Sequence, residues 1–329
     1  MPSIAVIIPF FARGPAVLAR TVRTVLGQKG VPTPLVIVVD DGSPQPASVE
    51  LSALGPDEMR HVRVIRQPNG GPPFARNTGL DAVPDNTDWV ALLDADDVWE
   101  EDHLARAVLA LEQGNDFYFS NFDRLGFVHF TRCGFDPSPH PLLPVGGTLH
   151  AFAGDFFTRN LTDSPVGTST VVFRRSVLGD LRFPLFPWTW EDLMFWLEAA
   201  DRTKRIVFDA KIAVHYDAGG IAGADGWQSP LELRRKLWYI QHFANVRERF
   251  RLTTEQRAIV DAEWRAHTFG FVVSTYSLLR RRHIPDRKTM LDFIKWNPAV
   301  LWYFIYVPFH IALARLLGRP TGVSHPGAG

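Results

Sequence analysis

The feature that most constrains the fold of this chain is the alternation, within residues 1–120, of short apolar runs with segments of helical periodicity. The runs are rich in β-branched residues and cover Ile4 to Ile8, Leu35 to Val39, Val62 to Ile65, Trp89 to Leu93 and Phe117 to Phe119. Between them, residues 16–26, 73–82 and 101–111 carry apolar side chains at three- and four-residue spacing. This βαβ order predicts an α/β fold of the Rossmann type, with a mostly parallel sheet flanked by helices and strands buried on both faces.

Polar residues follow three of these predicted strands at the point where each ends. They are Asp40-Asp41-Gly42-Ser43, Gln67-Pro68-Asn69-Gly70-Gly71-Pro72 and Asp94-Ala95-Asp96-Asp97. In an open α/β sheet the ligand binds beyond the carboxyl ends of the strands. The three segments are therefore expected to meet at one ligand site.

Each segment also has a plainer interpretation. Asp94 and Asp96 offer the hard oxygen ligands that Mg²⁺ or Mn²⁺ prefers, but a solvated turn that caps the next helix would use the same residues. Asp40 and Asp41 could accept hydrogen bonds from a nucleobase or a ribose, or could only shape a tight turn. The Gly-rich segment ahead of Arg76 suggests a loop close to a ligand, although it matches neither the Walker nor the dinucleotide fingerprint.

Composition narrows the choice of partner and compartment. The sequence has 35 basic and 35 acidic residues, so no overall positive field exists to hold nucleic acid. A single cysteine, Cys133, cannot form an internal disulfide, which suits a reducing cytosol. The N-terminus lacks a basic segment and its apolar run breaks at Pro9, so we expect a buried strand rather than a signal peptide and a cytoplasmic protein.

The rest of the chain divides into a loop-rich middle and a helical end. Residues 121–181 are rich in Gly, Pro and Phe, predict loops with one short strand at Ser169 to Phe173, and are expected to cover an acceptor. A helix pattern starts at Trp188 and a strand-like segment ends at Tyr216. Since helical periodicity dominates beyond Leu231, we predict a catalytic domain over 1–225 and a helical region over 226–329.

Five motifs in order resemble those of family 2 glycosyltransferases of GT-A fold. They are Val-Ile-Ile-Pro-Phe-Phe at 6–11, Val-Val-Asp-Asp-Gly-Ser at 38–43, Gly-Gly-Pro-Pro-Phe-Ala-Arg-Asn at 70–77, Leu-Leu-Asp-Ala-Asp-Asp-Val-Trp at 92–99 and Trp-Glu-Asp-Leu at 190–193. The resemblance implies that Asp41, with Asp40 and Arg76, contacts the uridine of a nucleotide-sugar donor. It further implies that Asp94 lies near the ribose.

The same resemblance implies the metal and catalytic roles. Asp96 would ligate a divalent ion, Mn²⁺ or Mg²⁺, that bridges the donor diphosphate, and Asp192 would be the catalytic base. His215 stands where several relatives have a histidine that completes the metal site; the plainer alternative is a structural histidine. We assign the remaining positions as follows: Pro9 and Ala95 to donor binding, and Trp190 and Glu191 to acceptor binding, with a solvated or capping charge as the alternative for Glu191.

Chemistry explains why these groups belong together. A sugar hydroxyl is a weak nucleophile, so a carboxylate must take its proton as it attacks the anomeric carbon, and a cation must stabilise the departing diphosphate. One direct displacement inverts the anomeric centre. A non-catalytic nucleotide-sugar-binding protein of the same fold is the main alternative from another class.

A narrower resemblance concerns the donor and the acceptor. Residues 66–72 and 116–121 are similar to bacterial glucosyltransferases that extend the lipid-linked repeat unit of succinoglycan-type exopolysaccharides. This would imply UDP-glucose as donor, a polyprenyl-diphosphate oligosaccharide as acceptor and a β-linked product. Another sugar nucleotide or an acceptor without lipid is the alternative.

The last helical stretch, Pro298 to Leu317, is apolar and aromatic but contains Pro308, His310 and Arg315. A membrane-spanning helix needs about 20 apolar residues with few charges, which disfavours a crossing. Two alternatives stay open: a helix that lies on the inner membrane surface, or helices that pack on the catalytic domain or form a homodimer interface.

Overall fold

The computed structural model describes residues 3–12, 17–185, 190–216 and 231–316 of the 329-residue chain. The described residues up to 185, together with 191–216, form one compact unit. Trp190 and residues 231–316 form a second. The boundary predicted between residues 225 and 226 lies outside the described residues.

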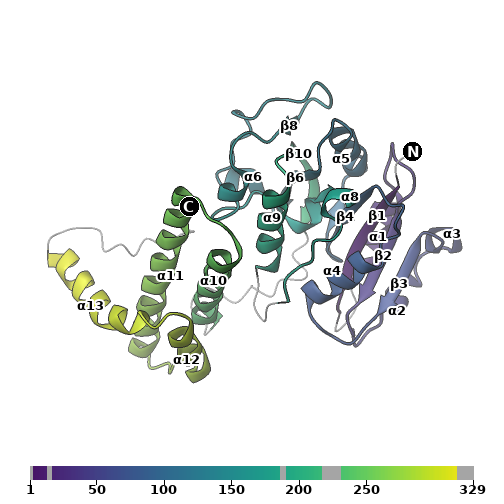
Figure 1. The fold of residues 1–329 in the computed structure, drawn as a ribbon. Helices are drawn as coiled ribbons and strands as arrows, with labels where there is room; N and C mark the ends of the chain where they lie inside the picture. The colour runs from purple at the N-terminus through teal and green to yellow at the C-terminus, as the bar shows by residue number, and fades with distance from the viewer. Residues whose placement is uncertain (1–2, 13–16, 186–189, 217–230, 317–329) are drawn as a thin grey trace. The chain divides into compact units, whose positions relative to one another are not determined.

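The first unit is built on one sheet in the strand order β3-β2-β1-β4-β9-β6-β10-β5, with β7 paired to β6 and β8 to β10 (Figure 1). The strands are β1 Ile4–Phe10, β2 Leu35–Asp40, β3 Val62–Arg66, β4 Trp89–Leu92, β5 Val98–Trp99, β6 Phe117–Arg124, β7 Phe127–Val128, β8 Leu149–Ala151, β9 Val172–Arg174 and β10 Ile206–Tyr216. Strands β3, β2, β1 and β4 run parallel, and so do β6 and β10. Antiparallel β9 joins these two parallel parts.

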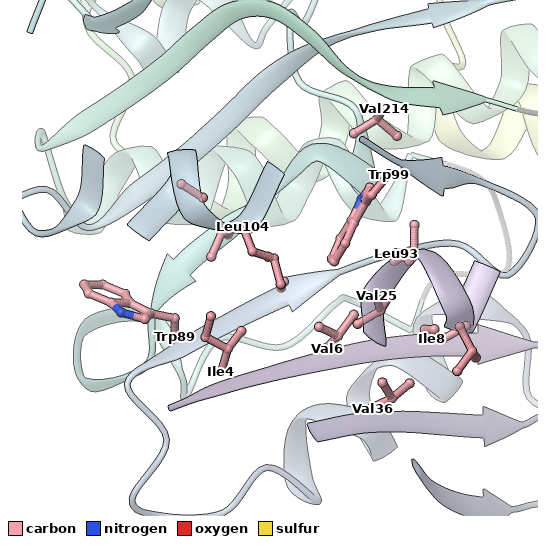
Figure 2. Close-up of a cluster of buried hydrophobic side chains, with 14 of the residues drawn as sticks. Ile4, Val6, Ile8, Val25, Val36, Trp89, Leu93, Trp99, Leu104 and Val214 are labelled. Carbon is pink, nitrogen blue, oxygen red and sulfur yellow. The ribbon is translucent and has the colours of Figure 1, made fainter. Parts of the chain in front are cut away.

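Helices cover both faces of the parallel part. In chain order the first unit has α1 Leu18–Leu26, α2 Ala47–Leu51, α3 Pro56–Met59, α4 Pro72–Asp81, α5 His103–Leu111, α6 His129–Arg132, α7 Phe156–Arg159, the 3₁₀ turn η1 Thr168–Thr170, α8 Arg175–Leu178 and α9 Glu191–Arg202. Ile4, Val6 and Ile8 share one face of β1 and pack with Val25 of α1 and Leu104 of α5 (Figure 2). Gly79 of α4 lies against Ile7 on the other face, where an added Cβ would come within 2.3 Å of that side chain. Alternation along one strand thus packs helices on both sides of the sheet.

Some expectations for these elements need correction. Strand β3 is at the edge of the sheet, and its outer edge has no neighbouring strand among the described residues. Its side chains are largely exposed, so the prediction of burial on both faces is wrong for this strand. The strand predicted at residues 169–173 is also shorter than expected. Residues 168–170 form a 3₁₀ turn, and strand β9 covers residues 172–174. The start of a helix predicted at Trp188 lies outside the described residues, and α9 runs from Glu191.

The second unit is helical, as the periodicity beyond Leu231 predicts. Its helices are α10 Leu231–Arg249, α11 Thr254–Arg280, α12 Arg287–Trp296 and α13 Val300–Leu316. It has a hydrophobic core of its own, which includes Leu237, Phe271, Phe293 and Val307, one from each helix. Among the described residues, no helix combines the length and the apolar character that crossing a membrane requires.

Candidate active site

The carboxylates at the end of β2 hold the backbone of the loops around them. Asp40 is 1% exposed, and its two side-chain oxygens accept hydrogen bonds from the backbone N–H groups of Ser43 (2.9 Å) and Ala47 (3.0 Å). Asp41 accepts from the N–H groups of Gly70 (2.9 Å) and Gly71 (2.7 Å). Asp41 therefore joins the end of β2 to the loop that follows β3.

This loop needs glycine where it enters α4. Gly71 has φ +88°, a left-handed conformation that side chains rarely adopt, and it precedes Pro72, the first residue of the helix. Gln67 also donates from its side chain to Asp41 (2.7 Å). The polar segments after β2 and β3 thus meet, as their positions after neighbouring strands predict.

The turn after β4 is fixed on two sides. Thr21 of α1 donates to the carbonyl of Ala95 (2.9 Å), and Arg20 donates to the carbonyl of Asp96 (3.2 Å). On the other side Ser169 accepts a hydrogen bond from the backbone N–H of Asp94 (3.0 Å) and donates to the buried carboxylate of Asp97 (2.5 Å). The η1 turn that carries Ser169 is therefore a support of the Asp94–Asp97 turn.

Arg76 ties this turn to the start of α9. Arg76 is 6% exposed, and its guanidinium forms ion pairs with Asp94 (2.8 Å) and Glu191 (2.9 Å) while lying over the ring of Phe183. Burial lowers the pKa of Arg76, but the carboxylates of Asp94 and Glu191 raise it above the ordinary value. Arg76 is thus a permanent positive charge that brings together three segments separated in the sequence.

Asp192 and Glu191 point to different partners. Glu191 binds Arg76, whereas the half-buried Asp192 accepts from the hydroxyl of Thr168 (3.4 Å) and from the N–H of Leu193 (2.8 Å). Burial and the negative charge of Glu191 raise the pKa of Asp192 to about 6, with Arg76 acting in the opposite direction. A carboxyl group with a pKa near neutrality is suited to accept a proton under physiological conditions.

His215 lies on β10 between two carboxylates. Its Nδ1 is 2.6 Å from Asp123 and its Nε2 is 2.7 Å from Glu100. Burial lowers the pKa of His215, but the hydrogen bonds and charges of Glu100 and Asp123 raise it above the ordinary value. Each ring nitrogen of His215 therefore lies within hydrogen-bond distance of a carboxylate, and the assignment of His215 to a metal ion stays a prediction.

The donor set at Asp96 fits a divalent ion that is shared with a substrate. Among the described residues no group of three or more His, Cys, Asp or Glu side chains is arranged to hold a metal by itself. Mg²⁺ is commonly held by one or two carboxylates together with substrate phosphates rather than by a cage of protein ligands. The carboxylate of Asp96, on a turn anchored through its backbone to α1, suits that mode of binding.

The remaining predicted residues are placed as follows. Pro9 is in β1, beside Val39 of β2. Trp190 belongs to the second unit, where its ring packs at a tilt of 38° against Tyr239 of α10, with 4.6 Å between centroids, and it has the left-handed φ of 86°. The sequence analysis missed four residues that contact the backbone or side chains of the predicted site: Thr21, Thr168, Ser169 and Phe183.

Comparison with known sequences finds a family whose members resemble the first part of this chain. Residues 5–132 match the sequence profile of the family described as Glycosyl transferase family 2. Over these residues the chain is similar to family 2 glycosyltransferases, which agrees with the predicted family. The match runs from β1 to α6 and so includes Asp41, Arg76 and Asp96.

Two relatives are similar over parts of their length. A succinoglycan biosynthesis protein, ExoW of Rhizobium meliloti, is 48% identical over 107 residues, which are 32% of this chain and 33% of that protein. A putative teichuronic acid biosynthesis glycosyltransferase, TuaG of Bacillus subtilis, is 27% identical over 202 residues, 60% of this chain and 71% of that protein. The aligned region thus spans only about a third of the ExoW protein.

Solved structures share the fold. TarS 1–349 of S. aureus superposes with a TM-score of 0.62 at 16% identity, over 96% of this chain and 92% of that chain, and it has also been solved with UDP-GlcNAc. A mannosyltransferase from Pyrobaculum calidifontis, solved with GDP-Man and Mn²⁺, superposes with a TM-score of 0.57 at 16% identity, over 97% of this chain and 88% of that chain. The predicted GT-A fold with helices at the C-terminal end is confirmed.

Proposed function

We propose that this chain is a family 2 glycosyltransferase that transfers a hexose from a nucleoside-diphosphate donor to a hydroxyl group, with inversion at the anomeric carbon and Asp192 as the base. The observation that supports this most is the ion-pair bridge from Asp94 through Arg76 to Glu191. It joins the turn that carries Asp96 to the helix that carries Asp192. A donor site and a proton acceptor are thereby held in one unit of the protein.

The residues have separate roles in a single displacement reaction. Asp192, with a pKa of about 6, is ionised at neutral pH and takes the proton of the acceptor hydroxyl as that oxygen attacks. Asp41 and the N–H groups it orders would line the nucleoside part of the donor. A divalent ion held by Asp96, when bound, supplies a Lewis acid for the diphosphate that departs. Because the displacement is direct, no covalent intermediate forms and no second carboxylate is needed as a nucleophile.

We further propose UDP-glucose as the donor and a growing, polyprenyl-diphosphate-linked exopolysaccharide unit as the acceptor. The name of the ExoW relative, succinoglycan biosynthesis, supports an exopolysaccharide product. The complex of the structurally similar TarS with UDP-GlcNAc supports a UDP-sugar, and the Mn²⁺ complex of the mannosyltransferase supports a divalent ion. Glucose itself rests on the resemblance of residues 66–72 and 116–121 to bacterial glucosyltransferases.

A screen of sugar nucleotides tests the proposal. Wild-type protein is incubated with each donor and with Mn²⁺ or Mg²⁺, and release of the nucleoside diphosphate is measured. UDP-glucose is expected to be turned over in a metal-dependent way, and Asp96→Ala is expected to lose this activity. Asp57→Asn is the matched control, because Asp57 is an exposed carboxylate on α3 outside the site.

Three outcomes contradict different parts of the proposal. Full activity of Asp96→Ala with every donor would remove Asp96 from its role, and turnover of another sugar nucleotide alone would replace glucose. If the protein bound a donor but did not turn it over, even after polyprenyl-diphosphate oligosaccharides were added, the result would instead support a nucleotide-sugar-binding protein.

A further inference from the structure

Helix α13 has two apolar faces, of which only one is covered. Val307 is fully buried, and partly buried Tyr303, Phe304 and Ile311 pack beside it on the core shared with α11 and α12. The opposite face carries large apolar side chains that are 43–77% exposed: Leu301, Trp302, Ile305, Tyr306, Phe309 and Leu313. A helix that is apolar all round is normally covered all round.

This exposure is concentrated in one part of the molecule. Eleven of the 20 exposed large hydrophobic side chains among the described residues lie between Tyr276 and Leu313. Figure 1 shows the helices of this segment, α12 and the yellow α13, next to α11. Contiguous apolar surface of this kind marks a docking site rather than ordinary surface scatter.

The segment that precedes α13 in the chain is basic. From the end of α11 through α12 the exposed cations are Arg280, Arg281, Arg282, Arg287, Lys288 and Lys295. The acidic residues in this stretch are Asp286, which caps the N-terminus of α12 by accepting from the backbone of Thr289, and Asp292, which pairs with Lys288. The sequence contains no Asp or Glu after Asp292.

These two properties decide between the partners that could cover the face. In a symmetric contact with a second copy the same patch faces itself, which brings like charges together. An anionic lipid surface instead attracts the cations and accepts the apolar side chains, and Trp and Tyr prefer the boundary between headgroups and acyl chains. Aromatic residues on an exposed helix flanked by Arg and Lys are typical of helices that lie in a membrane interface.

We propose that the outer face of α13, from Leu301 to Leu313, docks on an anionic lipid bilayer, with the basic residues of α11 and α12 against the lipid phosphates. The inference is independent of the sugar transferred and of catalysis by the first unit. It supplies a surface through which the protein would reach substrates that are anchored in a membrane.

Sedimentation with lipid vesicles tests the inference on the full chain. Binding is measured with vesicles of phosphatidylcholine alone and of phosphatidylcholine mixed with phosphatidylglycerol, at low and at high salt. The wild type is expected to sediment with the anionic vesicles and less at high salt. The double variant Trp302→Gln with Phe309→Gln is expected to lose about tenfold or more in binding, since each side chain removes large apolar area from water.

Matched variants separate docking from a general loss of structure. Trp302 and Phe309 are 65% and 77% exposed, so the double variant should keep the circular dichroism spectrum of the wild type. Phe127→Gln removes an aromatic ring that is 64% exposed on β7 of the first unit and should bind vesicles like the wild type. Arg280→Gln with Lys295→Gln should weaken binding to anionic vesicles and reduce its dependence on salt.

The inference is overturned if wild-type protein stays in the supernatant with anionic vesicles, or if the Trp302 and Phe309 double variant binds as well as the wild type. It is also overturned if the wild type does not bind vesicles but self-associates in analytical ultracentrifugation, while the double variant is monomeric. In that case a second copy of the chain covers α13.

Discussion

At the residue scale, one guanidinium organises the charges of the candidate site. Arg76 presents two nitrogens in a fixed plane, and each meets a carboxylate from a different segment, Asp94 and Glu191. Asp192 has neither of these ion pairs and, among the residues that the structure describes, accepts from Thr168 and Leu193, so its negative charge is the less stabilised one. This difference in surroundings separates a structural carboxylate from one that can act as a base.

The pH dependence of transfer follows from the pKa of Asp192. Burial and Glu191 raise it to about 6, and a base must be ionised to act. We therefore expect kcat/KM to fall as pH decreases through about 6, roughly tenfold per unit below it. The measurement is a pH series of kcat/KM with saturating metal. A profile that stays flat down to pH 4.5 would remove Asp192 from the role of base.

Asp192→Asn provides the control for this prediction. The variant should bind UDP but lose transfer, and it should melt at a higher temperature than the wild type above pH 6. A carboxyl whose pKa is higher in the folded state than in the unfolded state costs stability as pH rises between the two values, by about 3 kcal/mol for a shift from 3.8 to about 6. The gain of the variant should disappear near pH 4, and a gain that is equal at both pH values would contradict the shifted pKa.

A change at Arg76 should uncouple the two carboxylates without removing the charge. Arg76→Lys keeps a cation but loses the fork, so one point charge cannot bind Asp94 and Glu191 in the same geometry. We expect about a hundredfold loss of kcat/KM, because both the Asp94–Asp97 turn and the start of α9 would shift. Steady-state kinetics and the melting temperature are measured.

Arg182→Lys is the comparison for this variant, since Arg182 pairs with the exposed Asp81 at the protein surface and should tolerate the change. If Arg76→Lys kept wild-type kinetics, the ion-pair bridge would have no part in positioning the site.

At the scale of elements, the short turn η1 supports the end of β4. Ser169 accepts from the N–H of Asp94 and donates to buried Asp97, and its own carbonyl accepts from the indole of Trp99 (2.7 Å). A residue of η1 thus determines the shape of the turn that carries Asp96. We expect Ser169 to position the proposed donor site rather than to contact a reacting atom.

Ser169→Ala should therefore affect donor and metal more than the base. Removing the hydroxyl withdraws one donor from the buried Asp97 and costs about 1–3 kcal/mol of stability. We expect a higher KM for the donor and a higher metal requirement, with an unchanged pH profile for kcat. Ser138→Ala, which removes a hydroxyl bonded to exposed Asp136, is the control. A lower kcat at unchanged donor KM and metal requirement would contradict a positioning role.

Local patterns predict these elements unevenly. Strands β1, β2 and β4 follow from β-branched runs because all three are buried in the sheet, and α10 and α11 follow from apolar spacing. The edge position of β3 depends on the strand order, which no local pattern contains, but its sequence Val-Arg-Val-Ile-Arg has two arginines where β1, β2 and β4 have none, and this was a local sign of exposure. The Thr and Val residues around Ser169 favour a strand, but contacts with Asp97 and Trp99 hold a turn there.

The site was predicted as far as it depends on strand ends. The meeting of Asp41 with the Gly70–Gly71 loop follows from the carboxyl ends of neighbouring parallel strands. The bridge from Arg76 to Glu191 joins residues 115 positions apart, and no local spacing contains that information. The carboxylates that flank His215 are likewise distant in sequence, which is why its double pairing was not foreseen.

At the scale of the whole molecule, the two units have separate hydrophobic cores. One includes the inner face of β1 with α1 and α5, and the other is formed by α10 to α13. Separate cores allow local unfolding of one unit while the other stays folded, because the cooperative unit of unfolding is set by shared packing. The transfer reaction proposed for the first unit and the docking proposed for the second can then be perturbed one at a time.

A pair of cavity variants tests this separation. Phe271→Ala removes a buried ring stacked on Phe293 in the helical unit, and Phe117→Ala removes a buried ring packed on Trp196 in the first unit. Each should cost about 3–5 kcal/mol in its own unit. Hydrogen exchange followed by mass spectrometry should show faster exchange in α10 to α13 for Phe271→Ala, with release of nucleoside diphosphate retained and vesicle binding weakened. For Phe117→Ala the faster exchange should lie in the strands, with donor turnover lost. Equal acceleration of β1, β2 and β4 in both variants would show that the two cores unfold as one.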